Sequence, residues 1–435
     1  MVQGGSKNMD STASFYSKQQ VIITLAVSTI VLGILVGLSS LFLGLFLEWV
    51  EQVFLHYEET AKIPSPISTA PRTRLLSVTI GGVIAAIIWW LLRTKSQPTV
   101  SIKQTLAGEQ MPWWQTVIHV ITQIFYVGVG GSIGRELAPR EAGALLAQRW
   151  QSLLAKTRLS PLSTADRQLL IAAAAGAGFA GIYIAPITGM LFCVEVLLKK
   201  LSLRTVTVSL TMSTIAMFVG SIAKGFKPYY LIGDAKFSLA SLVFVLLLAP
   251  ICGLIGGLCR QLFQWAEKRQ TKNSHILWQL PLIAVITGLV SLKLPEIMGN
   301  GRSLAQLAIN SKQEHFLVIL LLGAIGKIII TTLTIRFGAA GGTLTPAIAI
   351  GAVVGAAIGL VLLPMFPALV IWQCAVIGAC TLLAASQQAP FMALFMIIEI
   401  CHLDYSAFLP LAIGTLLSIA VSKQVIQRLT NKRSY

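Results

Sequence analysis

Charged residues are scarce in this chain, and acidic residues are the scarcer kind. Only 11% of the 435 residues are charged, and 16 aspartates and glutamates stand against 33 lysines and arginines. Soluble domains carry about 25% charged residues, so this composition excludes an ordinary soluble domain. Uncharged apolar runs recur along the chain, and the first, residues 21–47, is long enough to cross a bilayer. The sequence therefore predicts a multi-pass integral membrane protein.

Sequence patterns of catalysis and metal binding are also lacking. No HExxH motif occurs, and the serine of GGSIG (residues 130–134) has no base beside it. The six cysteines lie apart without a CxxC pair, and the five histidines are isolated. His119, on an apolar stretch, reads as a satisfied helix residue. We therefore expect no enzyme activity, no metal and no cofactor.

The formal net charge of +17 comes mostly from basic residues in the tails and between the apolar runs. In a multi-pass membrane protein this pattern is typical of loops that stay in the cytoplasm. We expect both termini in the cytoplasm, the lipid bilayer as surroundings, and no nucleic-acid partner. Part of the charge has a functional interpretation, because a basic mouth attracts anions.

Two sequence elements occur twice, in the same order. GRELAPREAG (residues 134–143) is matched by GTLTPAIAIG (342–351), and APITGMLFCVE (185–195) by APFMALFMIIE (389–399). The separations of 208 and 204 residues divide the chain into related halves. We expect a tail, a first membrane repeat, a linker, a second membrane repeat and a basic C-terminal tail, with no appended soluble domain. Their predicted bounds are 1–20, 21–225, 226–237, 238–425 and 426–435.

Glycine and proline interrupt the apolar runs where these elements lie. Irregular backbone at membrane depth is tolerated only inside protein or beside a water-filled path. We therefore expect an all-helical polytopic fold of two related repeats of broken, tilted helices. If each half crosses the membrane an odd number of times, the repeats are inverted, and their broken helices meet near the midplane.

The glycine-rich turn before Pro346 has the composition of an anion site. Glycines that open a helix expose unpaired N–H groups, here those of Thr343 and Leu344, and the helix dipole adds roughly half a positive charge. The loop has no lysine and no GKS or GKT, which excludes a nucleotide P-loop. A glycine-packed helix contact is the alternative interpretation.

Glu136 occupies the equivalent place in the first half. A carboxylate at a helix N-terminus is itself an anion in an anion site, and protonation would release it. Glu136 is therefore a candidate gate or proton carrier. The alternative is a static ion pair with Arg135 or Arg140.

GSIGREL, GGTLTP and APITGMLFCVEV resemble three signatures of the CLC family of chloride channels and chloride/proton antiporters, namely GxGREGP, GxFxP and AP…E. The resemblance extends from about residue 21 to residue 423. It implies an inverted-repeat helical fold and a homodimer with one anion pathway per subunit. It makes Glu136 the gating, proton-linked glutamate and Glu195 a structural glutamate. The anion-binding residues that it implies are Gly134, Arg135, Gly342, Thr343, Leu344 and, by a loose match of KSQPT to the family's GSGIP, Ser96.

The chain also departs from the family pattern. Leu137 and Ala138 replace the Gly and Pro of GREGP. Val196 stands where antiporters of the family have an internal proton-relay glutamate, and valine carries no proton. The family's central tyrosine has no match except Tyr435, at the end of the chain.

The sequence therefore predicts CLC-type chloride transport that is channel-like or weakly proton-coupled and gated by Glu136. One alternative is a fluoride/proton or chloride/proton antiporter with a non-standard proton path, since some family antiporters lack the internal glutamate. A second alternative is a protein of the same fold that transports nothing.

Overall fold

The computed structural model describes residues 18–157, 162–234, 236–313 and 315–431. In those residues the regular elements are helices, and the sequence prediction of an all-helical fold is confirmed. The first half contains α1 (Lys18–Leu55), α2 (Pro71–Thr94), α3 (Ile102–Leu106), α4 (Trp113–Gly128), α5 (Leu137–Leu154), α6 (Thr164–Tyr183), α7 (Pro186–Leu191) and α8 (Leu203–Lys224). A π-helical turn, Phe192–Leu197, continues α7.

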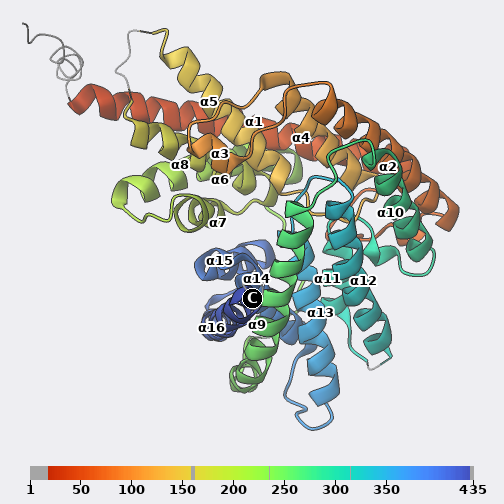
Figure 1. Cartoon of the computed structure of the whole chain (residues 1–435). Coiled ribbons are helices and arrows are strands. Elements are labelled where there is room, and N and C mark those ends of the chain that lie inside the picture. The colour runs from red at the N-terminus through yellow and green to blue at the C-terminus, as the bar shows by residue number, and fades with distance from the viewer. Residues whose placement is uncertain (1–17, 158–161, 235, 314, 432–435) are drawn as a thin grey trace, which may run out of the picture.

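The second half repeats this series. It contains α9 (Leu239–Lys268), α10 (Ile276–Ser291), α11 (Arg302–Asn310), α12 (Phe316–Arg336), α13 (Leu344–Leu362), α14 (Ile371–Gln387), α15 (Pro390–Cys401) and α16 (Phe408–Asn431). In Figure 1 the first-half helices, red to yellow-green, lie mostly above the second-half helices, green to blue. Seven described helices are long and apolar enough to cross a bilayer: α1, α2, α8, α9, α12, α13 and α16.

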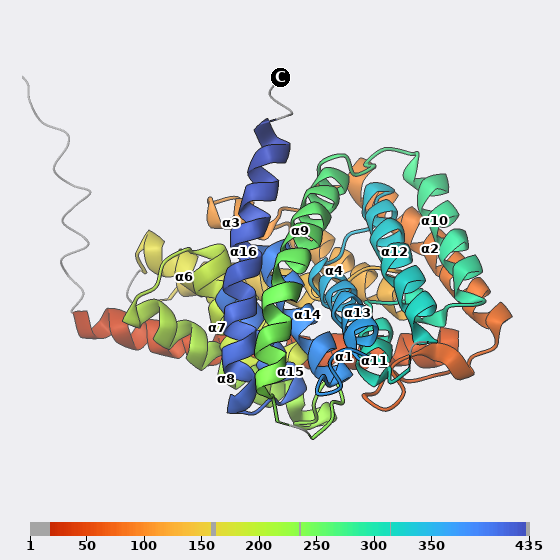
Figure 2. The same ribbon diagram turned by 90° about the horizontal axis from the view of Figure 1, so that it is seen from below.

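Equivalent helices pack in equivalent ways. In the first half, α1 lies along α8, and a Cβ at Gly33 or Gly37 would meet Ile215 or Val219 of α8. In the second half, α9 lies along α16, as Figure 2 shows, and Gly253 of α9 packs against the α16 backbone. Small residues at such contacts let two helix backbones approach closely, which substitutes for hydrophobic attraction inside lipid.

The Ala-Pro turns repeat down to their backbone angles. Ile184 and Gln388 end α6 and α14 in the left-handed conformation, with φ of 56° and 57°. The alanines that follow have nearly equal backbone angles, with φ of −131° and −138° and ψ of 78° and 83°. Pro186 or Pro390 then begins a new helix, where its missing N–H costs nothing. Two β-branched or bulky residues rarely adopt a positive φ by chance, so the shared geometry reflects the duplicated element.

Each half also caps a helix of the other. The Glu195 carboxylate accepts the N–H groups of Phe391 (3.2 Å) and Met392 (2.7 Å) at the start of α15. The Glu399 carboxylate accepts those of Ile187 and Thr188, both at 2.8 Å, at the start of α7. A carboxylate at a helix N-terminus satisfies orphan donors and opposes the helix dipole. These reciprocal contacts join the two halves at the Ala-Pro elements, in addition to any contact between the glycine-rich segments.

The ends of several helices can be compared with the predicted domain bounds. Of the predicted N-terminal tail, residues 1–17 lie outside the described part, and α1 begins at Lys18. The predicted linker falls between α8 and α9. The predicted C-terminal tail begins inside α16, which extends to Asn431, and Tyr435 lies outside the described residues.

Candidate functional site

The two glycine-rich segments meet in the buried interior of the protein. The N–H of Gly134 donates to the carbonyl of Gly342, and the N–H of Gly342 to that of Gly134, both at 2.8 Å. This bridge brings together the N-termini of α5 and α13, one from each half. A Cβ at either glycine would collide with the Glu136 carboxylate, so both positions require the bare backbone.

The Glu136 side chain points across this bridge to the N-terminus of α13. Its Oε1 accepts the backbone N–H of Leu344 at 2.7 Å, and its Oε2 accepts the hydroxyl of Thr345 at 2.9 Å. The carboxylate is fully buried. It therefore occupies the place where the exposed amides of a helix N-terminus would hold a free anion. The Thr345 hydroxyl also lies 3.0 Å from that of Tyr183.

The arginines beside Glu136 have other partners. Arg140 donates through Nε to the backbone carbonyl of Glu136 at 2.7 Å, and Arg135 Nη1 lies 3.2 Å from Glu59 Oε1. In the described residues, the hydrogen bonds of the Glu136 carboxylate are to the Leu344 N–H and the Thr345 hydroxyl, and the nearby Arg140 guanidinium attracts it.

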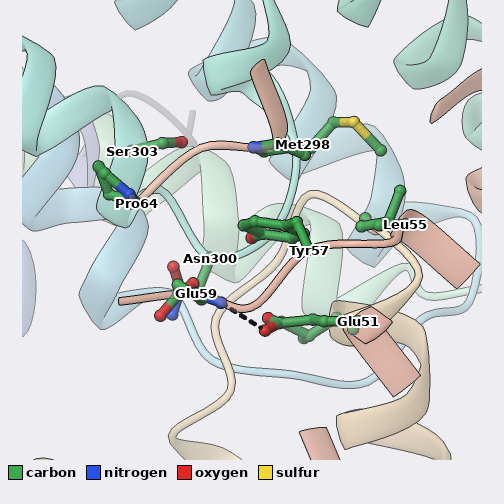
Figure 3. Close-up of a pocket in the computed structure, with 13 residues that line it drawn as sticks. Glu51, Leu55, Tyr57, Glu59, Pro64, Met298, Asn300 and Ser303 are labelled. Carbon is green, nitrogen blue, oxygen red and sulfur yellow. Dashed lines mark hydrogen bonds between the residues drawn. The ribbon is translucent and has the colours of Figure 1, made fainter. Parts of the chain in front are cut away.

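A cluster of buried charges surrounds Arg135. Arg302 Nη1 lies 3.0 Å from the same Glu59 oxygen, and both guanidinium groups stack on the ring of Tyr229. A small adjacent pocket, of about 10 Å³, is lined by Glu51, Glu59 and Gly130, among others. Figure 3 shows the hydrogen bond from the Glu59 backbone to the Glu51 carboxylate in this pocket. Such a volume holds about one water molecule.

A much larger cavity reaches the site from another direction. It has a volume of about 550 Å³ and extends to Gly342 and Thr343. Its charged lining residues are Arg93, Arg140, Lys272, Glu141 and Glu267. The loop that carries Glu136 therefore borders the small pocket at Gly130 and the large, polar cavity at Leu137.

The structure places the other sequence-predicted residues as follows. Thr343 lines the large cavity. Ser96 is exposed, and its loop lines the cavity through residues 98–101 instead. Val196 is half-buried in the π-helical turn, an apolar side chain in apolar surroundings. Glu195 has the capping contacts already described.

Sequence reasoning missed Lys327, which lies under the first glycine-rich loop. Its ammonium is fully buried and donates to the hydroxyl of Ser132 (3.0 Å) and to the carbonyls of Ile297 (3.2 Å) and Gly299 (2.6 Å). A buried ammonium is costly unless its donors are satisfied, and here three oxygens satisfy it. The signal was available, since a lone lysine inside the apolar run of α12 requires an explanation.

The chain is similar to known proteins over most of its length. The family model described as voltage gated chloride channel matches residues 81–423, which is more than half of the chain. The chain belongs to this family. Proteins named voltage-gated ClC-type chloride channel ClcB are similar to it, one from Salmonella typhimurium at 28% identity (86% of this chain, 90% of the relative) and one from Citrobacter koseri at 29% (82% and 85%).

Solved structures of the voltage gated chloride channel family share the fold. A slow cyanobacterial Cl⁻/H⁺ antiporter has a TM-score of 0.77 at 22% identity, covering 96% of this chain and 98% of the other. A CLC-type fluoride/proton antiporter has a TM-score of 0.66 at 20% identity, covering 94% and 98%. The chain is therefore a multi-pass membrane protein of CLC-type architecture, and its family consists of anion transporters and channels.

Proposed function

We propose that the protein moves chloride across the membrane and that Glu136 is its gate. The position of the Glu136 carboxylate carries the proposal. It is held by the Leu344 N–H and the Thr345 hydroxyl at a helix N-terminus, where a permeating anion would otherwise bind. Chloride passes when the carboxylate leaves, and protonation favours departure because a neutral carboxyl is held less strongly by those donors.

The large cavity is the proposed approach for the anion. It leads to Gly342 and Thr343, and its basic residues Arg93, Arg140 and Lys272 outnumber its acidic ones. A cavity lined by an excess of one charge raises the local concentration of the opposite ion. Arg149 near the end of α5, Lys156 after it and Lys268 at the end of α9 are basic, and by the positive-inside rule they support a cytoplasmic location for these helix ends. We propose the same location for both termini.

Weak coupling to protons is proposed over tight exchange. Val196 occupies the position of the family's internal proton-relay glutamate and carries no proton, which supports flux that is channel-like or loosely coupled. The names of relatives in both groups, chloride channels and chloride/proton antiporters, support chloride as the ion. We also propose a homodimer in lipid with one pathway per subunit, as the family resemblance implies.

Glu136→Gln tests this function in chloride-loaded liposomes. Glutamine imitates the neutral gate, so chloride efflux should persist and lose most of its pH dependence, whereas wild-type efflux should rise toward acid pH. Reversal potentials measured under opposed chloride and proton gradients then distinguish exchange from passive flux. Identical pH profiles for the variant and the wild type would show that Glu136 is a structural residue. If neither protein passes chloride, the alternative of a protein with this fold that transports nothing is favoured.

A further inference from the structure

One wall of the large cavity carries a chain of buried polar side chains that the anion site does not use. Trp89 donates through Nε1 to Nδ1 of His119 at 3.1 Å. His119 Nε2 in turn lies 3.6 Å from Oε2 of Glu141, and Gln123 donates to the same oxygen at 2.6 Å. All four side chains are buried, and His119 and Glu141 line the cavity.

The hydrogen bonds assign the protons in this chain. Because Nδ1 of His119 accepts from Trp89, the proton of the neutral ring is on Nε2, which faces Glu141. Both contacts of Glu141 are made by Oε2, so Oε1 remains to take a proton from the cavity. The Oε1 atom of Gln123 is buried without a partner. With the proton on Oε1, the Oε2 atom of Glu141 still accepts from Gln123, so this hydrogen bond is kept in both protonation states.

Glu141 is also well placed relative to the gate. It follows Glu136 by five residues at the start of α5, roughly 7.5 Å along the helix axis. Leu137 and Arg140, between them, line the same cavity, as does Thr343 beside the anion site. Water in this cavity can therefore contact Glu141 and approach Glu136.

The charges that face Glu141 come from several elements. Arg140 is its neighbour on α5, Arg93 extends from α2, and Glu267 and Lys272 lie at or after the end of α9. Arg140 is engaged with the Glu136 carbonyl, and Arg93 donates to the carbonyl of Thr271. His119 and Gln123 lie within ion-pair or hydrogen-bond distance of the Glu141 carboxylate, and the guanidinium of Arg140 attracts it from the same helix.

We propose that Glu141 is the residue that passes protons from the cavity to the gate. Its carboxylate takes a proton from cavity water, and the proton moves through water to the Glu136 carboxylate. Glu141 is then ionised again, and Glu136 is neutral and free to leave the anion site. The role of internal proton donor thus lies beside the anion path, at Glu141, and not at Val196. This inference rests on the proposed function of Glu136.

Glu141→Gln is the test, with Glu267→Gln as the matched control. Both remove one carboxylate from the lining of the same cavity, but Glu267 is exposed and belongs to α9. Chloride efflux and proton movement are measured in liposomes over a range of pH. We expect Glu141→Gln to slow both by tenfold or more and to flatten the pH profile, and Glu267→Gln to keep the wild-type profile.

The double variant separates proton delivery from a structural role. If Glu141 only delivers protons, it is dispensable when the gate is permanently neutral, so Glu136→Gln/Glu141→Gln should match Glu136→Gln in chloride flux. Equal slowing by Glu141→Gln in both backgrounds, or no slowing in either, would overturn the inference. A pH-independent Glu136→Gln together with an unaffected Glu141→Gln would leave the proposed function standing and refute this inference alone. If Glu141→Gln does not yield folded protein, Glu141→Asp, which withdraws the carboxylate by one methylene, should show the same dependence on background.

Discussion

Replacing Thr345 by valine removes one of the two hydrogen bonds that hold the Glu136 carboxylate, the proposed gate. The Thr345 hydroxyl donates to Oε2 of Glu136 at 2.9 Å, and the side chain is fully buried. Valine has nearly the same shape, so the helix N-terminus and its Leu344 N–H should stay in place. The change therefore weakens the hold on the carboxylate without rebuilding the site.

The size of the effect follows from the chemistry of the contact. A hydrogen bond to a charged group contributes about 1.5–3 kcal/mol, and about 1.4 kcal/mol is a tenfold change in an equilibrium. Loss of the Thr345 bond should reduce the ratio of seated to displaced carboxylate by roughly 10–150-fold. The remaining Leu344 bond keeps the seated state from vanishing.

Chloride efflux from liposomes at alkaline pH is the assay, because the proposed function expects Glu136 to block wild-type efflux most strongly there. Thr345→Val should raise alkaline efflux strongly and change acid efflux little, which flattens the pH profile. Thr345→Ser keeps the hydroxyl and should behave as wild type. Tyr183→Phe removes the hydroxyl that lies 3.0 Å beyond Thr345 and separates its contribution from the direct bond.

Two results would refute this reasoning. Alkaline efflux that is unchanged in Thr345→Val would show that the hydroxyl does not restrain the gate. Efflux that falls at every pH in Thr345→Val, but not in Thr345→Ser, would show that the hydroxyl serves the permeating ion instead.

The remaining predictions concern the contacts that hold the halves together. Glu399→Gln weakens the cap on α7, including the bond to Thr188, and should lower the free energy of unfolding by about 1–3 kcal/mol; an unchanged thermal midpoint in detergent would contradict a capping role. Lys327→Met leaves the Ser132 hydroxyl and the Gly299 carbonyl without their donor, at about 1–3 kcal/mol for each unsatisfied group. We expect a clearly lower thermal midpoint and poor recovery of folded protein, and a midpoint equal to wild type would show that water replaces the ammonium.

Much of the central arrangement is visible in the sequence because the chain contains it twice. The paired glycine elements predict that two helix N-termini meet, and Glu136 differs from its counterpart Leu344 in bearing a charge. This part of the site can be predicted from local sequence, because a glycine-rich turn and a carboxylate at a helix N-terminus lie within a few residues of each other.

The residues that the sequence did not predict depend on distant neighbours. Tyr183 reaches the site only because α6 ends beside α13, 162 residues further on. Glu59 and Arg302 meet across 243 residues, and neither belongs to a repeated element. Ser96 matches the family pattern only loosely, and residues 98–101 of its loop line the cavity instead. Contacts between residues so far apart in the chain cannot be predicted from sequence spacing when the residues belong to no repeated element.

The pair of hydrogen bonds between Gly134 and Gly342 limits how large a motion the transport cycle can use. Many carriers expose their cargo to each side in turn by rocking one bundle against the other. In this protein such rocking would break the Gly134–Gly342 backbone hydrogen bonds. It would also break the contacts by which Glu195 and Glu399 each cap a helix of the other half. If the proposed function holds, we expect opening and closing to use the movement of the Glu136 side chain within a helical frame that changes little.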